Sequence, residues 1–353
     1  MTQGEPVRFE PVLSNAPPTE DNPAPKAPPI PLVQAERLTK VFPLRTSWFR
    51  KPRLIRAVDA VSLYVRRGET LGVVGESGCG KTTLGRILLR LVEPTFGRIA
   101  FDGREISLIS QRQLRPLRQH LQIVFQDPFA SLNPRMRVED IVAEGIVVHH
   151  LARNRKDRRE AVVQTLNAVG LPADAMERYP HEFSTGERQR IGIARALAVQ
   201  PSFIVCDEPV SALDVSVRAQ LTNLLLDLQQ ARRLSYLFIS HDLTAVRSLC
   251  HRVAVMYLGR FVEVGQTPEV FAQPQHPYTQ ALMSAAPVAD PDRKRLRIVL
   301  EGEPPNPAEP PEGCPFHPRC PRNDGAECAR KTPELTETHA GSHHRVACWH
   351  PVG

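Results

Sequence analysis

Short apolar runs, separated by charged and glycine-containing segments, recur along the chain and predict buried β-strands. The clearest runs lie at residues 70–74, 121–125, 203–206 and 237–239, where nearly every side chain is apolar. Such runs are typical of strands buried in the interior of a fold. We therefore expect these segments to be its central strands.

Two further strands are expected near the N-terminus, and a hairpin after the first helix. Residues 33–42 resemble an edge strand, and residues 57–65 alternate as a half-buried strand does. The arginine-rich residues 43–56 between them are expected to be an insert. Residues 96–103 indicate the hairpin.

Apolar positions at helical spacing follow the strand at 70–74 and recur in the middle of the chain. The first set is Leu84, Ile87, Leu88 and Leu91. Residues 138–178 are charged and periodic, so they are expected to be largely helical, with apolar positions at Val162, Leu166, Val169 and Leu171. The basic run at 153–159 is best interpreted as a solvated helix face, with a nucleic-acid contact as the less favoured alternative.

A glycine-rich loop joins the strand at 70–74 to the first helix, which is the setting of a phosphate-binding P-loop. Glycines let backbone N–H groups surround an anion, and the helix N-terminus adds its positive dipole end. Lys81 can reach the β- and γ-phosphates, and the Thr82 hydroxyl can bind Mg²⁺; a chance glycine-rich turn is the alternative. The expected nucleotide-site residues are Gly75, Glu76, Ser77, Gly78, Cys79, Gly80, Lys81, Thr82 and Thr83.

Polar side chains stand at the ends of three buried strands. In a P-loop enzyme, Asp207 would bind Mg²⁺ and Glu208 would polarise the attacking water, whereas a solvated acidic turn is the alternative. Gln126 ends a second strand. His241 follows a third, and taken alone it would be a capping or surface residue.

A second helix N-terminus is indicated at Ser184, with Glu187 three residues further on. This is the spacing of a capping box, in which each side chain bonds the other's backbone N–H. Structurally, the pattern indicates only a well-capped helix. Functionally, it offers a second helix N-terminus that can bind phosphate.

Length and composition set the bounds for these interpretations. The 353 residues suffice for one large domain and a small one, and the net charge of +7 suits either anionic lipid headgroups or nucleic acid. No apolar stretch is long enough to span a membrane or to act as a signal peptide, so we expect a cytoplasmic protein. Residues 1–32 are proline-rich and are expected to be a disordered tail.

Four of the seven cysteines crowd the C-terminal segment, at Cys314, Cys320, Cys328 and Cys348. In a cytosolic chain such a cluster suggests a metal rather than disulfides. Because no Cys-x2-Cys pair is present, an ordinary zinc ribbon is disfavoured, and an iron–sulfur cluster, zinc, or reduced metal-free thiols stay open. The alternative ligands, more simply interpreted as exposed tail histidines, are His317, His343, His344 and His350.

Together these motifs resemble the ATP-binding subunit of an ABC transporter over about residues 33–350. The resemblance assigns Walker A to Gly75–Thr82, Walker B to Phe203–Asp207, the catalytic glutamate to Glu208, the Q-loop to Gln126, the D-loop to Ser211–Asp214 and the switch histidine to His241. It also implies that Phe42, or less clearly Trp48, stacks on adenine.

The signature loop departs from the family pattern Leu-Ser-Gly-Gly-Gln. Ser184 and Gly186, which the resemblance places against the γ-phosphate of ATP on the opposite subunit, are kept, but Thr185 and Glu187 replace a glycine and the glutamine. A β-branched residue restricts the backbone, and a carboxylate near phosphate is unfavourable. We expect these two changes to bear on the efficiency of that half-site.

The resemblance implies an α/β P-loop fold of ABC type, with a RecA-like core, an antiparallel β subdomain and a helical subdomain. It divides the chain into an ATP-binding cassette at 33–270, whose helical subdomain spans about 127–195, and a C-terminal extension at 271–353.

Finer matches, especially His276-Pro277-Tyr278-Thr279 and the cysteine-bearing tail, are similar to the second ATPase subunit of oligopeptide/dipeptide permeases. That resemblance implies a heterodimer with a homologous ATPase, two membrane permease subunits and an extracytoplasmic solute-binding protein. It also implies ATP and Mg²⁺ as cofactors, a four-iron four-sulfur cluster held by the tail cysteines, and a peripheral position on the cytoplasmic face of the membrane.

Other functions stay open as alternatives. Relatives of this kind also carry nickel, glutathione or other small solutes. A soluble ABC protein acting on DNA or ribosomes is disfavoured, because residues 81–184 leave no room for an inserted coiled coil and the chain holds one cassette. No nucleic-acid partner is therefore expected. A purely redox-sensing module is also disfavoured, because every ATPase position is filled.

Overall fold

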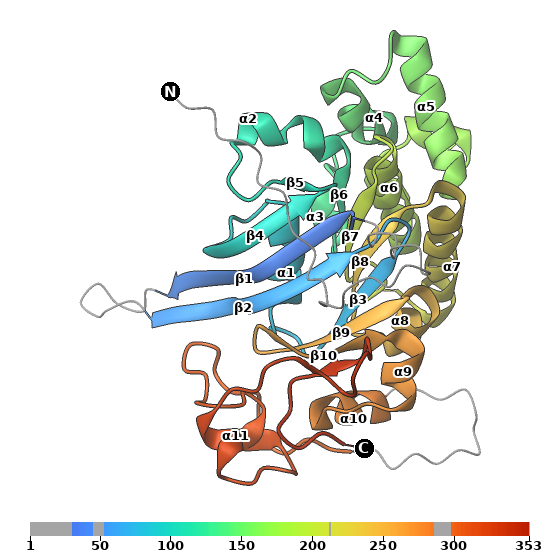
Figure 1. The fold of residues 1–353 in the computed structure, drawn as a ribbon. Helices are drawn as coiled ribbons and strands as arrows, with labels where there is room; N and C mark the ends of the chain where they lie inside the picture. Colours follow the sequence, from blue (N-terminus) through green and yellow to red (C-terminus); the bar gives the residue numbers. More distant parts are fainter. Residues whose placement is uncertain (1–29, 45–52, 212, 286–297, 353) are drawn as a thin grey trace, which may run out of the picture.

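The computed structural model describes residues 30–44, 53–211, 213–285 and 298–352. Its strands are β1 (Val33–Leu44), β2 (Arg53–Val65), β3 (Thr70–Val74), β4 (Phe96–Phe101), β5 (Arg104–Glu105), β6 (Leu121–Val124), β7 (Phe203–Asp207), β8 (Ser235–Ile239), β9 (Arg252–Tyr257), β10 (Arg260–Gln266), β11 (Thr336–Glu337) and β12 (Arg345–Val346). They form a four-stranded sheet, β2-β1-β4-β5, and an eight-stranded sheet, β11-β12-β10-β9-β3-β8-β7-β6 (Figure 1).

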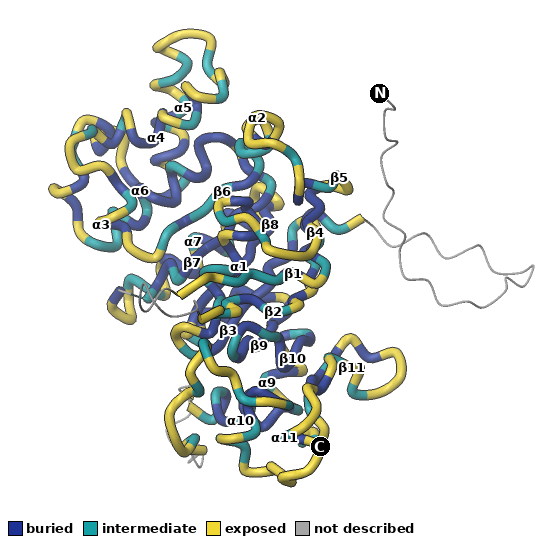
Figure 2. The backbone as a smooth tube through the Cα atoms, turned by 90° about the vertical axis from the view of Figure 1, so that its left-hand side faces the viewer, coloured by how far each residue is buried: buried dark blue, intermediate teal, exposed yellow. Residues whose placement is uncertain are grey.

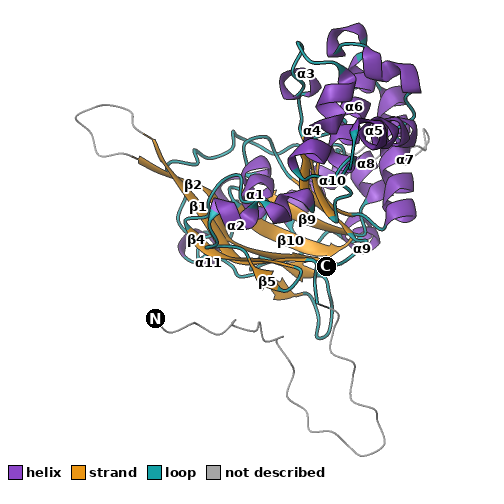
Figure 3. Ribbon diagram, turned by 90° about the horizontal axis from the view of Figure 1, so that it is seen from above, coloured by secondary structure: helices purple, strands orange, loops and turns teal. Residues whose placement is uncertain are grey.

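Helices surround these sheets and gather mainly at one end of the molecule. They are α1 (Lys81–Leu88), α2 (Gln111–Leu114), α3 (Pro128–Ser131), α4 (Val138–Val148), α5 (Arg155–Ala168), α6 (Thr185–Leu197), α7 (Val215–Arg232), α8 (Leu243–Leu249), α9 (Thr267–Ala272), α10 (Pro277–Ser284) and α11 (Glu327–Arg330). Short 3-10 turns are η1 (Pro116–Gln119), η2 (Ala173–Glu177), η3 (Pro180–Glu182) and η4 (His317–Arg319). Figure 3 shows α3 to α7 on the side away from β1 and β2.

Five neighbouring strands of the larger sheet, β6, β7, β8, β3 and β9, run parallel. Their carboxyl ends therefore meet at one edge, which is where ligands bind in open α/β sheets. Leu84, Ile87 and Leu88 of α1 belong to a buried cluster that also contains residues of both sheets. Helix α1 is thus fixed between the sheets, with its N-terminus at that edge. Figure 2 shows the burial concentrated in the strands and exposure in the surrounding loops.

The strands expected at 70–74, 121–125, 203–206 and 237–239 are confirmed as β3, β6, β7 and β8. Three of them are fully buried, whereas β6 is partly buried at its two middle residues. The expected hairpin at 96–103 is also confirmed, since β4 pairs with β5 around a turn at Asp102 and Gly103, both with positive φ. Helices α4 and α5 lie in the segment expected to be helical.

The expected insert at 43–56 is shorter than the sequence indicated. Strand β1 continues to Leu44 and β2 already begins at Arg53, with Phe42 paired to Ile55 and Leu44 to Arg53. The pairing extends because backbone hydrogen bonds need no apolar face, and the side chains of Leu44, Arg53 and Leu54 are exposed. Residues 45–52, including Trp48, lie outside the described ranges.

The first described residues and the C-terminal region both contact the sheets. Of the N-terminal tail expected at 1–32, residues 1–29 lie outside the described ranges, but Leu32 is buried and its carbonyl accepts the Asp102 N–H at 2.7 Å. At the other end, β12 pairs with β10 and β11 with β12, so the C-terminal region adds strands to the larger sheet. Among the described residues, no helix has the length and apolar character needed to cross a membrane.

Candidate nucleotide site

The loop after β3 is shaped by glycines that closely approach other backbone segments. Gly75 has a φ of 153°, and a Cβ there would lie 2.2 Å from the carbonyl oxygen of Met256. Gly80 has a φ of 109°, and its Cβ would lie 2.0 Å from the carbonyl oxygen of Ala57. Neither position has room for a side chain, so the loop is confined between β9 and β2.

The Lys81 ammonium group is folded back into this loop. It is 5% exposed, and its Nζ donates to the carbonyl oxygens of Gly75 at 2.8 Å and Glu76 at 2.9 Å. The cation therefore lies inside the ring of backbone atoms and beside the N-terminus of α1, which favours an anion there. The remaining expected members of the loop and the first helical turn are Ser77, Gly78, Cys79, Thr82 and Thr83.

Thr82 and Asp207 lie side by side at the carboxyl edge of the sheet. The Thr82 hydroxyl donates to Asp207 Oδ1 at 2.8 Å. Asp207 is 2% exposed, and burial raises the pKa of its carboxyl group, while the Thr82 hydrogen bond acts in the opposite direction. A hydroxyl and a carboxylate are oxygen ligands of the kind Mg²⁺ prefers, so this pair fits the cation.

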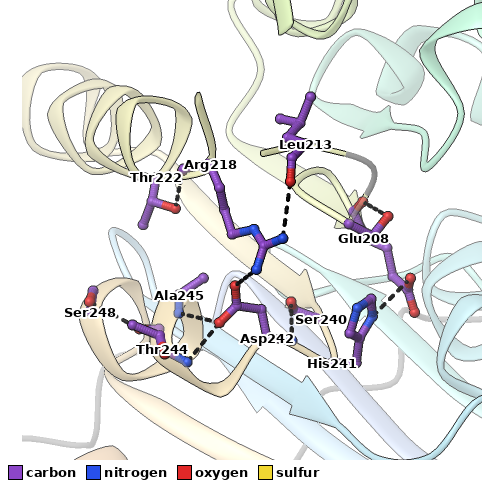
Figure 4. Close-up of polar contacts among 11 residues, drawn as sticks. Glu208, Leu213, Arg218, Thr222, Ser240, His241, Asp242, Thr244, Ala245 and Ser248 are labelled. Atoms are coloured by element: carbon purple, nitrogen blue, oxygen red, sulfur yellow. Dashed lines mark hydrogen bonds and ion pairs between the residues drawn. The ribbon is translucent and has the colours of Figure 1, made fainter. Parts of the chain in front are cut away.

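Glu208 connects two further polar residues that the sequence singled out. Its Oε2 accepts Gln126 Nε2 at 3.1 Å and lies 3.2 Å from His241 Nδ1, as Figure 4 shows for the histidine. Gln126 thus contacts Glu208 rather than the Thr82–Asp207 pair in this structure. Glu208 also has a positive φ of 46°, a strained conformation that is common at functional sites.

Arg218 connects two turns near Glu208 and His241 by hydrogen bonds, and it was not identified from the sequence. It donates to the Leu213 carbonyl oxygen at 3.0 Å and to Asp242 Oδ2 at 2.8 Å (Figure 4). Asp242 caps α8 directly after His241. Arg218 therefore links the expected D-loop to the switch histidine. The available signals were a basic residue in the first turn of α7 and a capping aspartate after the histidine.

The signature residues lie on α6 and share no hydrogen bond with the groups above within the described ranges. Ser184 caps α6, and Glu187 completes the expected capping box: its Oε2 accepts the Ser184 N–H at 2.9 Å and hydroxyl at 2.7 Å. Those hydrogen bonds lower the pKa of the Glu187 carboxyl group. Gly186 faces α7, where a Cβ would lie 2.6 Å from Val217 Cγ1. Asp214 caps α7 through the Val217 N–H.

Phe42, the expected adenine-stacking residue, lies near the end of β1. Its ring is 38% exposed, and the Lys40 ammonium group lies 5.1 Å from the ring centroid. Phe42 is therefore partly exposed, with the Lys40 ammonium group over its ring. Trp48 lies outside the described residues.

The four C-terminal cysteines lie in one small region. Cys314 and Cys328 are buried, Cys320 and Cys348 are partly buried, and the Cys314 N–H donates to the Cys328 carbonyl oxygen at 2.8 Å. Burial, assisted by the charges of the other three, raises the pKa of the Cys314 thiol to about 11. Thiolates are ligands of zinc and of iron–sulfur clusters. The four sulfur atoms are not gathered within 4.8 Å of one another, and the only such group among the described residues is Asp324, Cys328 and His350.

His344 departs from the expectation of exposed tail histidines, whereas the His350 side chain is 42% exposed, as expected. His344 is 6% exposed, with its Nε2 2.7 Å from the buried Glu263 carboxylate. His350 lies with Asp324 and Cys328, and the potential ligand atoms of these three residues are within 4.8 Å of one another. The chain turns back at β12, which pairs with β10 and brings His344 against Glu263 of that strand. Sequence spacing does not reveal this contact.

These features define a class of protein. A lysine-bearing glycine loop and an oxygen pair suited to Mg²⁺ meet at the carboxyl edge of a parallel sheet, and a second carboxylate, Glu208, follows directly after Asp207. This arrangement is that of P-loop nucleotide hydrolases. A cleft of about 350 Å³ opens beside the loop, lined in part by Glu76, Ser77, Arg218 and His241.

Comparison with known proteins identifies the family. Residues 58–211 match the ABC transporter family, and residues 262–328 match the oligopeptide/dipeptide transporter C-terminal region. A probable peptide ABC transporter ATP-binding protein of Sinorhizobium fredii is 53% identical, covering 82% of each chain. An oligopeptide transport ATP-binding protein of Bacillus subtilis is 50% identical, covering 90% of this chain and 96% of the relative.

Solved structures agree with this result. CbiO1 of Clostridium perfringens, part of an ABC transporter complex, matches with a TM-score of 0.60 and 28% identity, covering 69% of this chain and 91% of that one. A dimeric ATP-binding cassette bound to ADP and Pi matches with a TM-score of 0.60 and 25% identity, covering 67% and 98%. The chain therefore belongs to the ATP-binding proteins of the ABC transporter family and is an ABC-type ATPase. The fold and family expected from the motifs are confirmed.

Proposed function

We propose that this chain is the ATP-hydrolysing subunit of a membrane importer for di- and oligopeptides. The observation that carries the proposal is the arrangement of Lys81, the Thr82–Asp207 pair and Glu208 at one edge of the sheet. The match to the oligopeptide/dipeptide C-terminal region and the names of the relatives support peptides as the solute. Import of nickel, glutathione or another small solute is the alternative for the same motor.

Each site residue has a proposed role in this reaction. Lys81 binds the β- and γ-phosphates, and Thr82 and Asp207, with Gln126 in support, hold Mg²⁺, which when bound neutralises phosphate charge. Glu208 orients the attacking water, and His241 stabilises the negative charge that develops on the γ-phosphate. Phe42 stacks on adenine, while Ser184, Gly186 and Asp214 contribute to the ATP site of the opposite subunit.

The working assembly would be a pair of homologous ATPases beneath two membrane permease subunits, supplied by a solute-binding protein. The loop that begins at Gln126 would contact the membrane subunits, which places the chain on the cytoplasmic face of the membrane. The same proposal divides the chain into a cassette at 33–270 and an extension at 271–353. Membership of a transporter family supports these partners.

The decisive experiment replaces Glu208 by Gln in the full chain purified with its partner ATPase. The variant should keep MgATP binding and lose at least about a hundredfold in steady-state hydrolysis, because the amide cannot polarise water. A closed dimer should accumulate with ATP and be visible by size-exclusion chromatography. The matched control is Glu93→Gln, since Glu93 is a surface carboxylate with a 72% exposed side chain. Retained hydrolysis in Glu208→Gln would refute the assignment.

We further propose that Cys314, Cys320, Cys328 and Cys348 hold a four-iron four-sulfur cluster. The cluster would stabilise the C-terminal segment, which is poor in apolar residues. Zinc bound with help from Asp324 and His350 is the competing arrangement, supported by the proximity of these two residues to Cys328. Anaerobic purification followed by iron, sulfide and zinc analysis separates the two. Iron and sulfide that are lost on Cys314→Ser would support the cluster, whereas stoichiometric zinc or no metal would refute it.

A further inference from the structure

The C-terminal region reaches the nucleotide loop through an arginine. Arg319, in η4, donates from Nη1 to both carboxylate oxygens of Glu76 at 3.1 and 2.9 Å, and from Nη2 to Oε1 at 3.1 Å. Its side chain is only 7% exposed, and that of Glu76 is 27% exposed. A forked, largely buried pair of this kind is stronger and more directional than a surface ion pair.

A tyrosine from the same region holds the backbone of Glu76. The Tyr278 hydroxyl accepts the Glu76 N–H at 2.8 Å. The Tyr278 ring is fully buried and packs against Tyr257, with centroids 4.7 Å apart, and against Phe316, with centroids 5.4 Å apart. The two neighbouring rings come from β9 and from the segment that carries Arg319, so packing from two other elements holds the Tyr278 hydroxyl in place.

Glu76 is consequently fixed at three points. Its carboxylate is held by Arg319, its N–H by Tyr278, and its carbonyl oxygen by Lys81 at 2.9 Å. Because Lys81 also bonds the neighbouring Gly75 carbonyl, the position of Glu76 helps to set the position of the ammonium group. A displacement of the Glu76 backbone would therefore be passed to the cation and to the adjoining loop amides.

We propose that Arg319 and Tyr278 are positioning residues for ATP binding, which hold the P-loop in its phosphate-binding shape through Glu76. The C-terminal region is then part of the nucleotide site rather than only an appendage to it. This inference rests on the proposed role of the 75–82 loop in binding ATP phosphates, and it is independent of the transported solute.

The test measures MgATP affinity by calorimetry on the full chain, and kcat and KM for ATP with its partner ATPase. Arg319→Ala and Tyr278→Phe should each raise the dissociation constant and KM about tenfold, with kcat at saturating ATP nearly unchanged, because they act on loop shape and not on the chemical step. Arg319→Lys keeps the positive charge but cannot form the bidentate hydrogen bonds of a guanidinium group. Its dissociation constant and KM should therefore lie between those of the unmodified protein and those of Arg319→Ala. Arg322→Ala is the matched control, since Arg322 lies in the same segment but bonds the Pro351 carbonyl.

A double-mutant cycle separates positioning from a loss of folding. Once Glu76→Gln has removed the carboxylate charge, adding Arg319→Ala should cost little further affinity, because the two residues act as one unit. Unchanged affinity in both Arg319→Ala and Tyr278→Phe would overturn the proposal, as would equal effects of Arg319→Ala and Arg322→Ala. If Arg319→Ala fails to fold, Tyr278→Phe, which removes one oxygen atom, decides alone. Lys81→Ala tests the loop itself: normal binding there would refute the nucleotide site, not only this inference.

Discussion

The carboxylate of Glu187 faces back to the start of its own helix, where it accepts two hydrogen bonds from Ser184. Its negative charge is stabilised there by the N-terminus of α6 and is not left free. Thr185 occupies the first helical position, where a β-branched residue requires no left-handed backbone. Glu187 thus has the capping role that its spacing from Ser184 predicted, and Thr185 is compatible with the helical backbone.

Two glycines give opposite predictions for the same substitution. Gly80→Ala should destabilise the protein by about 3 kcal/mol and abolish MgATP binding, because the residue has a positive φ and a Cβ would meet the Ala57 carbonyl oxygen at 2.0 Å. Gly192→Ala, inside α6, should leave binding intact and stabilise by about 0.5–1 kcal/mol, since no atom lies within 4 Å of its added Cβ. Thermal unfolding and calorimetry check both. Equal destabilisation by the two would contradict the argument.

At the scale of elements, helices and strands were predicted best where the residue pattern within a single segment is sufficient to identify the element. Continuous apolar runs identified β3, β6, β7 and β8, and Ser184 with Glu187 identified the start of α6. The extension of β1 and β2 beyond residues 42 and 57 was missed because an exposed hairpin arm needs backbone pairing but no apolar pattern. The contacts of Arg319 and Tyr278 with Glu76 were missed because they join distant parts of the chain, for which one sequence carries no signal.

The turns that carry the predicted D-loop and the predicted switch histidine are joined by the Arg218 side chain, which leads to a prediction at this scale. Arg218→Ala should lower kcat about tenfold and leave KM for ATP nearly unchanged, because the arginine holds the Asp242 turn beside His241 and not the phosphate loop. Arg247→Ala is the control, since Arg247 lies exposed on α8. Steady-state ATPase assays provide the measurement. A rise in KM with constant kcat would contradict this role.

At the scale of the whole molecule, the C-terminal region is integrated with the ATPase core by two kinds of contact. Strand β12 extends the larger sheet through β10, and the buried Glu263 of β10 accepts hydrogen bonds from the Gln275 and His276 N–H groups and pairs with His344. Burying a carboxylate is costly unless it is paired in this way, so these contacts have to form together. The cassette and the C-terminal region are expected to unfold as one unit.

The coupling between the C-terminal region and ATP binding can be measured in either direction. If the C-terminal region supports ATP binding through Glu76, then ATP binding must stabilise that region by the same free energy, because linkage is reciprocal. MgATP should therefore slow amide hydrogen exchange in peptides covering residues 276–280 and 314–320, as well as in the loop at 75–82. Peptides from α5, which packs against α4, α6 and η2, should exchange at an unchanged rate. Protection of the loop without protection of residues 314–320 would show that the Arg319–Glu76 contact does not transmit binding energy. In Arg319→Ala, loop protection should persist at saturating MgATP while protection of residues 314–320 disappears.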